Sequence, residues 1–178
     1  MKHLNPLFFL SLLFAVQTAL ALPEDREQPI HIQADRAEID DLKGVARYTG
    51  NVVITQGSIK ITGERATITR TEGGTVDVFT AIGKPATFRQ QPAADKEVVD
   101  AYGLTIQYFA GKDQVLLIDQ ARVEQGGSAF AGEKIVYDTA RQIVNAGRAN
   151  GHNITVPSPR IDMVIQPKQN SAQEGNNP

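Results

Sequence analysis

The 178-residue sequence predicts an all-β sandwich or roll. Apolar and polar residues alternate with a period of two in many short segments, and Gly- or Asp-bearing turns separate these segments at roughly ten-residue spacing. After the first twenty-one residues, no segment has the spacing of a convincing amphipathic helix. Because successive side chains of a strand point to opposite faces, each segment presents one apolar face to a shared interior.

The clearest segment runs from Gly44 to Thr69 and predicts three short strands. Val52 and Ile54 lie on one face of the first predicted strand, and Ile59 and Ile61 lie on the corresponding face of the next. The glycines at the two breaks are typical of hairpin turns. We therefore expect these four aliphatic side chains to point into the interior.

A weaker copy of this segment follows 69 positions later. The pairs Gln56-Gly57 and Gly63-Glu64 recur as Gln125-Gly126 and Gly132-Glu133. A single repeat is fewer than the three copies that mark a solenoid. We interpret it as two similar β-halves within one continuous fold.

Further strands are expected on both sides. Ile30-His31-Ile32 begins the alternation, and residues Ile161 to Ile165 form the last strand. Gln91 to Lys96 is polar, contains Pro92 and is expected to form a long loop. Val115 to Ile118 is apolar on both faces, which predicts a strand covered from both sides.

The first residues have the pattern of a secretory signal peptide. Leu7 to Leu20 is almost wholly apolar, and Ala19-Leu20-Ala21 fits a small-x-small cleavage site. A membrane anchor is the alternative, but the apolar run is shorter than the roughly 20 residues that span a bilayer, and Pro23 follows. We expect cleavage after Ala21 and export to the periplasm.

The remaining chain is expected to form one domain. Residues 22–27 are polar and predicted to be mobile, residues 28–165 carry the strands, and residues 166–178 have the composition of a disordered tail.

Composition excludes several classes of function. The formal net charge is −2, from 18 Lys and Arg against 20 Asp and Glu, which argues against a nucleic-acid partner. The chain has no Cys, so it has no disulfide, thiol chemistry or Cys-ligated metal.

No pattern in the sequence predicts an enzyme. His31 falls on a polar face and His152 stands alone, so neither predicts a metal site. The acidic residues between Asp35 and Asp41 fit a solvated turn better than a catalytic or calcium-binding cluster. We therefore expect no metal and no cofactor.

The interior is expected to consist mainly of Ile and Val. The sequence has no Trp, and Phe and Trp are the bulkiest side chains for filling a core. Two alternatives remain: an interior that is incompletely filled, or an aliphatic core packed by Ile and Val alone.

The first and last predicted strands lack the usual protection of a sheet edge. Neither has an internal Pro or an inward Lys. Such edges can pair with a neighbouring molecule head to tail, or they can pair with each other or be covered by loops. The residues concerned are Ile30, His31, Ile32, Ile161, Met163 and Ile165.

Three motifs resemble one known family. Residues 28–35 (QPIHIQAD), 50–57 (GNVVITQG) and 83–88 (GKPATF) are similar, in order and spacing, to the periplasmic lipopolysaccharide-transport protein A family, also called LptA/OstA-like. The resemblance covers about residues 28–165. It implies a twisted, open β-jellyroll of about 14–16 antiparallel strands in two facing layers, with an apolar groove between them.

The resemblance also implies a function and partners. Lipopolysaccharide would be carried from the inner to the outer membrane, with its lipid A acyl chains in the groove. Partners would be further copies stacked head to tail and membrane components with the same fold at either end. A structural or adhesive β-scaffold with a solid core and no lipid is the alternative.

The same resemblance suggests lipid-binding positions. It places Ile30, Phe88 and Tyr108 against lipid. Alternation of the strands adds further candidates, which are Ile32, Val52, Ile54, Ile59, Ile61 and Ile106.

Overall fold

The structure is a computed structural model that describes residues 25–147 and 160–166. The expected signal peptide (1–21), His152 and the tail from residue 167 lie outside the described residues. Within the described ranges, no helix is long and apolar enough to cross a membrane.

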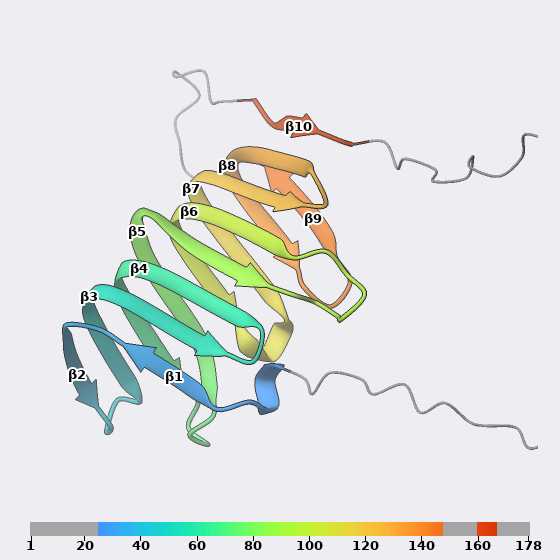
Figure 1. Cartoon of the computed structure of the whole chain (residues 1–178). Helices are drawn as coiled ribbons and strands as arrows, with labels where there is room; N and C mark the ends of the chain where they lie inside the picture. The colour runs from blue at the N-terminus through green and yellow to red at the C-terminus, as the bar shows by residue number, and fades with distance from the viewer. Residues whose placement is uncertain (1–24, 148–159, 167–178) are drawn as a thin grey trace, which may run out of the picture.

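Ten strands and two short 3-10 helices make up the described chain (Figure 1). The strands are β1 (Ile30–Gln33), β2 (Arg36–Asp40), β3 (Val45–Gln56), β4 (Ile59–Arg70), β5 (Val76–Gln90), β6 (Val99–Phe109), β7 (Gln114–Gln125), β8 (Ser128–Asp138), β9 (Ile143–Gly147) and β10 (Asp162–Val164). The helices are η1 (Asp25–Glu27) and η2 (Ala110–Lys112). Asp25–Glu27 thus forms η1 within the stretch that was expected to be mobile.

All strands belong to one antiparallel sheet, in the order β1-β3-β4-β5-β6-β7-β8-β10. β2 also pairs with β3, and β9 also pairs with β8. β1 and β10 lie at opposite ends of this order, so the first and last predicted strands do not pair with each other. Both are sheet edges, as the sequence predicts.

The long strands fold over so that the single sheet makes two layers. Each of β3 to β8 is interrupted near its middle by a register shift, which divides it into two arms, and each arm pairs with the corresponding arms of the neighbouring long strands. The two arms of β3 have different short partners, β1 and β2, and the two arms of β8 pair with β10 and β9. One set of arms, completed by β1 and β10, forms the layer called here the β1 layer. The other set, completed by β2 and β9, forms the β2 layer.

When each arm is counted as a strand, the ten strands agree with the expected number of about 14–16. Each of the six long strands gives one arm to each layer, and the four short strands complete the two layers with two each, so eight arms form each layer. The result is the all-β, open, two-layered fold that the sequence predicts, bent at one margin and open at the other (Figure 1).

Glycine makes most of the bends possible. A Cβ at Gly63 would lie 2.8 Å from the carbonyl oxygen of Ile82, and one at Gly83 would lie 2.7 Å from the amide nitrogen of Ala86. Real side chains do not fit at such distances. A larger residue at Gly63 would push β4 and β5 apart, and one at Gly83 would clash with the bend of β5 itself. β7 has no glycine at its bend and uses Asp119 and Gln120, whose φ values are +61° and +53°.

The bends and the turns define two margins. The ridge is the margin where the long strands bend, at Gly50, Gly63, Gly83, Gly103, Asp119-Gln120 and Gly132. The mouth is the opposite margin, where the strands of both layers end in turns or loops. Those of the β1 layer are residues 57–58, 91–98 and 126–127, and those of the β2 layer are residues 41–44, 71–75, 110–113 and 139–142.

Element bounds follow the internal repeat. β3 starts at Val45 and β7 at Gln114, 69 positions later, and β4 and β8 start at Ile59 and Ser128 with the same offset. The repeated unit is therefore a bent hairpin, and Gly63 and Gly132 occupy its equivalent bends.

One local expectation is wrong. Val115 and Leu117 are fully buried, but Leu116 and Ile118 on the opposite face of β7 are only half-buried. Since each layer packs on the other through one face alone, the outer face of β7 has no covering layer among the described elements. The apolar run of residues 115–118 therefore does not indicate a doubly covered strand.

Candidate functional site

An unbroken row of apolar side chains crosses the inner face of the β1 layer. Its members are directly paired from strand to strand, so they line up across the sheet rather than along one strand. From the β1 edge to the β10 edge the row is Ile32, Ile54, Ile61, Phe88, Ala101, Val123, Phe130 and Met163.

A matching row crosses the inner face of the β2 layer. From β2 to β9 it comprises Ile39, Ala46, Ile68, Phe79, Tyr108, Val115, Tyr137 and Val144. A second row beside it, on the ridge side, contains Ile106 and Leu117. The two layers therefore face each other with apolar surface from one end of the molecule to the other.

These rows are closed in the middle and open at the ends. Phe88 and Ala101 are 0% exposed, because the two layers pack on each other there. At the ends, Ile39 is 59% and Met163 is 50% exposed. The apolar interior therefore reaches the surface at both ends of the sheet.

All nine predicted lipid-binding residues lie on these inner faces. Seven of them are buried, and these are Val52, Ile54, Ile59, Ile61, Phe88, Ile106 and Tyr108. Ile30 and Ile32 are half-buried at the β1 edge and pack against the same core. The middle of this structure is packed, as in the second alternative for the interior, but not by Ile and Val alone: its largest fully buried side chains are Tyr108, Tyr137, Phe79 and Phe88.

The predicted edge residues are more accessible. His31 points outward from β1 and is exposed. Ile161 and Met163 are each 50% exposed, and Ile165 is 66% exposed. β10 pairs with β8 over three residues, so its outer edge remains available to another strand.

An aromatic contact joins the layers behind the mouth. The ring of Phe88, in the β1 layer, lies 5.6 Å from the ring of Tyr108, in the β2 layer. Tyr108 also stacks on Phe79, with 5.9 Å between ring centroids. Burial raises the pKa of Tyr108 to about 12, with the nearby Asp113 carboxylate adding to the effect.

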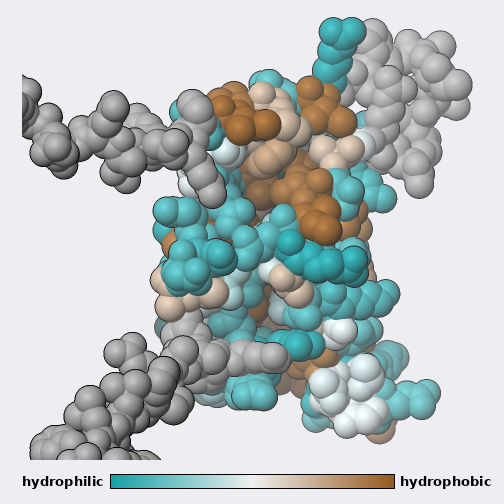
Figure 2. All heavy atoms as spheres, turned by 90° about the vertical axis from the view of Figure 1, so that its right-hand side faces the viewer, coloured by the Kyte–Doolittle hydropathy of each residue, from teal (hydrophilic) through white to brown (hydrophobic). Residues whose placement is uncertain are grey.

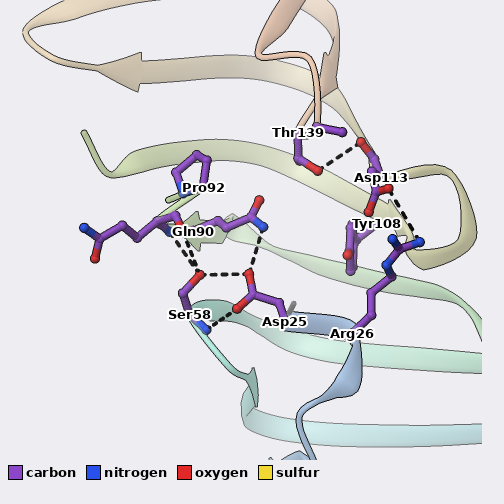
Figure 3. A pocket seen from close by; sticks show the side chains of 10 residues that line it. Asp25, Arg26, Ser58, Gln90, Pro92, Tyr108, Asp113 and Thr139 are labelled. Atoms are coloured by element: carbon purple, nitrogen blue, oxygen red, sulfur yellow. Dashed lines mark hydrogen bonds and ion pairs between the residues drawn. The ribbon is translucent and has the colours of Figure 1, made fainter. Parts of the chain in front are cut away.

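Asp25–Gln28, called here the latch, lies across the mouth outside this contact (Figure 3). The Asp25 carboxylate accepts hydrogen bonds from the Ser58 backbone N–H (2.6 Å), the Ser58 hydroxyl (2.8 Å) and the Gln90 side-chain amide (2.9 Å). Ser58 and Gln90 both belong to the β1 layer.

Gln56 strengthens the attachment to the β1 layer. Its side-chain amide donates to the carbonyl oxygens of Arg26 (3.2 Å) and Gln28 (3.1 Å). Gln56 ends β3 and is only 7% exposed, so these bonds are largely sheltered from water.

On the other side, the latch reaches the β2 layer through charge. Arg26 Nη1 lies 3.6 Å from Asp113 Oδ2 in the turn between η2 and β7. The backbone oxygen of Asp113 accepts from both the N–H (2.8 Å) and the hydroxyl (3.0 Å) of Thr139, which links two turns of the β2 layer (Figure 3). A cavity of about 270 Å³ lies between these groups, with Tyr108 in its wall.

The other half of the mouth is more apolar. Figure 2 looks onto the mouth and shows apolar surface gathered toward the end that carries β8, β9 and β10. Phe130 and Val144, near this end, are only partly buried against the core. Tyr137 lies deeper; burial raises its pKa to about 12, and its hydroxyl has no hydrogen-bond partner within the described structure.

Apolar side chains make up most of the described site. The described residues contain no cluster of three or more His, Cys, Asp or Glu that could hold a metal ion. The site is a pair of facing apolar surfaces, with most of its polar groups along the mouth. Such an arrangement suits an elongated amphiphile, whose apolar part lies inside and whose polar part stays outside.

Comparison with known proteins places the chain in a family. Residues 31–143 match the family described as "LptA/(LptD N-terminal domain) LPS transport protein". The chain belongs to this LptA family. The resemblance inferred from the three sequence motifs is thereby confirmed.

Two characterised members of the LptA family illustrate the likeness. The chain is 59% identical over 172 residues to lipopolysaccharide export system protein LptH of Pseudomonas aeruginosa, covering 95% of this chain and 98% of that protein. It is 36% identical over 174 residues to lipopolysaccharide export system protein LptA of Escherichia coli K12, covering 96% and 91%. These relatives are transport proteins, in agreement with the expectation that the chain is not an enzyme.

A solved member of the LptA family has the same fold. The crystal structure of LptH from Pseudomonas aeruginosa, described as the LptA-homologous periplasmic component of the lipopolysaccharide transport device, matches with a TM-score of 0.75 and 61% identity. The match covers 82% of this chain and all of that chain.

Sequence reasoning missed the latch. Asp25 and Arg26 lie in a polar stretch without periodicity, and their partners Ser58, Gln90 and Asp113 are far away in the chain. Only the apolar alternation was a usable signal, and it marks inner faces rather than the polar contacts that close the mouth.

Proposed function

We propose that the chain is a periplasmic lipopolysaccharide carrier that holds lipid acyl chains between its two layers. The observation that carries the proposal is the pair of inner rows, which run without a polar break from one end of the sheet to the other. Lipid would lie against Phe88, Tyr108 and their neighbours in these rows, while the sugars remain at the mouth. Membership of the LptA family supports the same function.

The energetics of such a carrier require no chemical step. Burial of a methylene group is worth about 0.8 kcal/mol, so an acyl chain of about twelve to fourteen carbons is held in a membrane by about 10 kcal/mol. When an acyl chain slides between the two layers, contacts between the layers are replaced by protein–lipid contacts of the same apolar kind. The inner rows therefore offset most of the cost of leaving a membrane.

We further propose that copies of the chain stack head to tail. β1 and β10 are opposite edges of the same layer, and β2 and β9 are opposite edges of the other. Strand pairing between the last edge of one copy and the first edge of the next would be heterologous and would build a rod. It would cover the exposed ends Ile39 and Met163 and make the inner rows continuous between copies.

The same edges would meet the membrane components. A partner with the same fold, anchored in the inner membrane, would pair at one end, and an outer-membrane translocon component would pair at the other. Depletion of the protein should then prevent newly made lipopolysaccharide from reaching the cell surface. Continued delivery in depleted cells would contradict this role.

Site-specific crosslinking tests the lipid site. A photocrosslinking residue in place of Phe88, at the centre of the inner face, should trap lipopolysaccharide. The same residue in place of Lys60, which is exposed on the outer face of β4, is the control and should not. Crosslinks from Lys60 and none from Phe88 would refute the proposed faces. No crosslink and no co-purifying lipid by mass spectrometry would favour a structural scaffold with a solid core.

A further inference from the structure

We propose that the latch is a gate at a lateral lipid port, and that it opens by parting from the β2 layer at Arg26 and Asp113. The inference rests on the proposed function, because it concerns how an acyl chain reaches the inner rows. The port is the part of the mouth that lies over Tyr108, where the cavity of about 270 Å³ already separates the two layers.

Position is the first argument. The strands of both layers end in turns at the mouth, so the layers can separate there without breaking the sheet, whereas the ridge is formed by continuous strands. Directly behind the latch, Phe88 and Tyr108 meet across the layers. An acyl chain passing the latch would therefore arrive at two side chains of the proposed lipid site.

The second argument is that the latch is held unequally by the two layers. Asp25 and Gln56 together make five hydrogen bonds between the latch and the β1 layer, and these are partly buried. Toward the β2 layer, the latch makes the Arg26–Asp113 ion pair, whose side chains are 42% and 29% exposed. An exposed ion pair contributes little, roughly 0–1 kcal/mol. Opening should thus occur at Arg26 and Asp113, with the latch remaining on the β1 layer.

The chemistry of the rim is the third argument. Ser58, Gln90 and Thr139 place hydroxyl and amide groups around the cavity, outside an apolar interior. The side-chain oxygen of Gln90 is buried and accepts no hydrogen bond within the described structure. An amphiphile entering here meets apolar surface with its acyl chain and polar groups with its headgroup. A free hydrocarbon would lack the second set of contacts.

A reversible crosslink tests the gate. Because the chain has no Cys, Arg26→Cys with Asp113→Cys can be joined by a bis-maleimide linker that contains a reducible disulfide. The matched control is Lys60→Cys with Arg89→Cys, two exposed positions that are paired within the β1 layer. Both proteins are mixed with fluorescent lipopolysaccharide, and the rate of uptake is measured before and after reduction of the linker.

The linked gate should take up lipid at least tenfold more slowly than the unlinked protein, and reduction should restore the rate. The linked control should behave as the wild type. Uptake at the wild-type rate by the linked gate, with the wild type itself binding lipid, would overturn the gate and leave the proposed function intact. Absence of uptake by the wild type would overturn both.

A charge exchange provides a second test without a linker. Arg26→Glu places two carboxylates at the gate and should accelerate uptake by roughly two- to fivefold, the factor that corresponds to an ion pair of up to about 1 kcal/mol. Adding Asp113→Arg restores an opposite pair and should return the rate to that of the wild type. Equal rates for all three proteins would contradict the gate.

Discussion

The two halves of the mouth close the same interior in different ways. Near β1, the latch covers the margin through partly buried hydrogen bonds that Asp25 accepts and Gln56 donates. Near β10, the margin exposes apolar surface (Figure 2). Phe130 is only partly buried. Apolar rows alone therefore do not keep the interior closed. The two layers meet behind the latch, whereas apolar surface remains exposed toward the end that carries β10.

The largest expected difference between the halves is in packing. Phe88 and Phe130 belong to the same inner row, but Phe88 is 0% exposed whereas Phe130 is half-buried. Phe88→Ala should lower the free energy of unfolding by about 3–5 kcal/mol, because it leaves a cavity. Phe130→Ala is the matched change and should cost about 1–2 kcal/mol. Denaturant unfolding measures both, and equal costs would contradict a difference in closure.

Alkaline unfolding compares the two halves through Tyr108 and Tyr137. The pKa of each tyrosine is raised to about 12, chiefly by burial, whereas an unfolded chain ionises its tyrosines near pH 10. Between these values the unfolded state has lost protons that the folded state keeps, so stability falls as pH rises through this interval. At pH 12, each tyrosine should have lowered the free energy of unfolding by roughly 2–3 kcal/mol.

Tyr137→Phe separates the contribution of one tyrosine. At neutral pH the variant should be more stable than the wild type by about 1 kcal/mol, since it removes a buried hydroxyl that has no hydrogen-bond partner among the described residues. It should also lose less stability than the wild type between pH 10 and 12. A variant that is less stable at pH 7 would indicate that the hydroxyl has a favourable contact.

The sequence predicts the inner faces well and the margins poorly. Ile54 and Ile61 were predicted to face inward because strand alternation is a local signal, and they do. Phe88, which was predicted from the family resemblance, also faces inward. Gly63 was expected to end one strand, but it bends a continuous one, since a glycine break looks the same in both cases. Bonds such as Asp25 to Gln90 leave no periodic trace in the sequence, because they join polar residues 65 positions apart.

The latch should make a measurable contribution to stability. Asp25→Ala removes the carboxylate that accepts three hydrogen bonds. The partly buried donors on Ser58 and Gln90 then lose this acceptor. We expect a loss of about 2 kcal/mol in the free energy of unfolding. Asp95→Ala, in an exposed loop where the carboxylate contacts Lys96, should have almost no effect. Comparable losses from both would mean that the latch does not hold the mouth.

The smallest expected effect concerns the ridge. Gln120 has a φ of +53°, in the left-handed region that a side chain disfavours, at the one bend among β3–β8 without glycine. Gln120→Gly should raise the free energy of unfolding, by less than about 1 kcal/mol, because glycine adopts this conformation readily. A matched Gln107→Gly change, within regular β6, should lower it.

The most direct test of lipid binding between the layers is a distance across them. Spin labels on Arg89→Cys, in the β1 layer, and Gln107→Cys, in the β2 layer, report the separation by pulsed electron resonance, and the chain has no other Cys. Saturation with lipopolysaccharide should lengthen the distance by roughly 4 Å, the contact spacing of one inserted acyl chain. An unchanged distance in protein that has bound lipopolysaccharide would show that the lipid lies elsewhere.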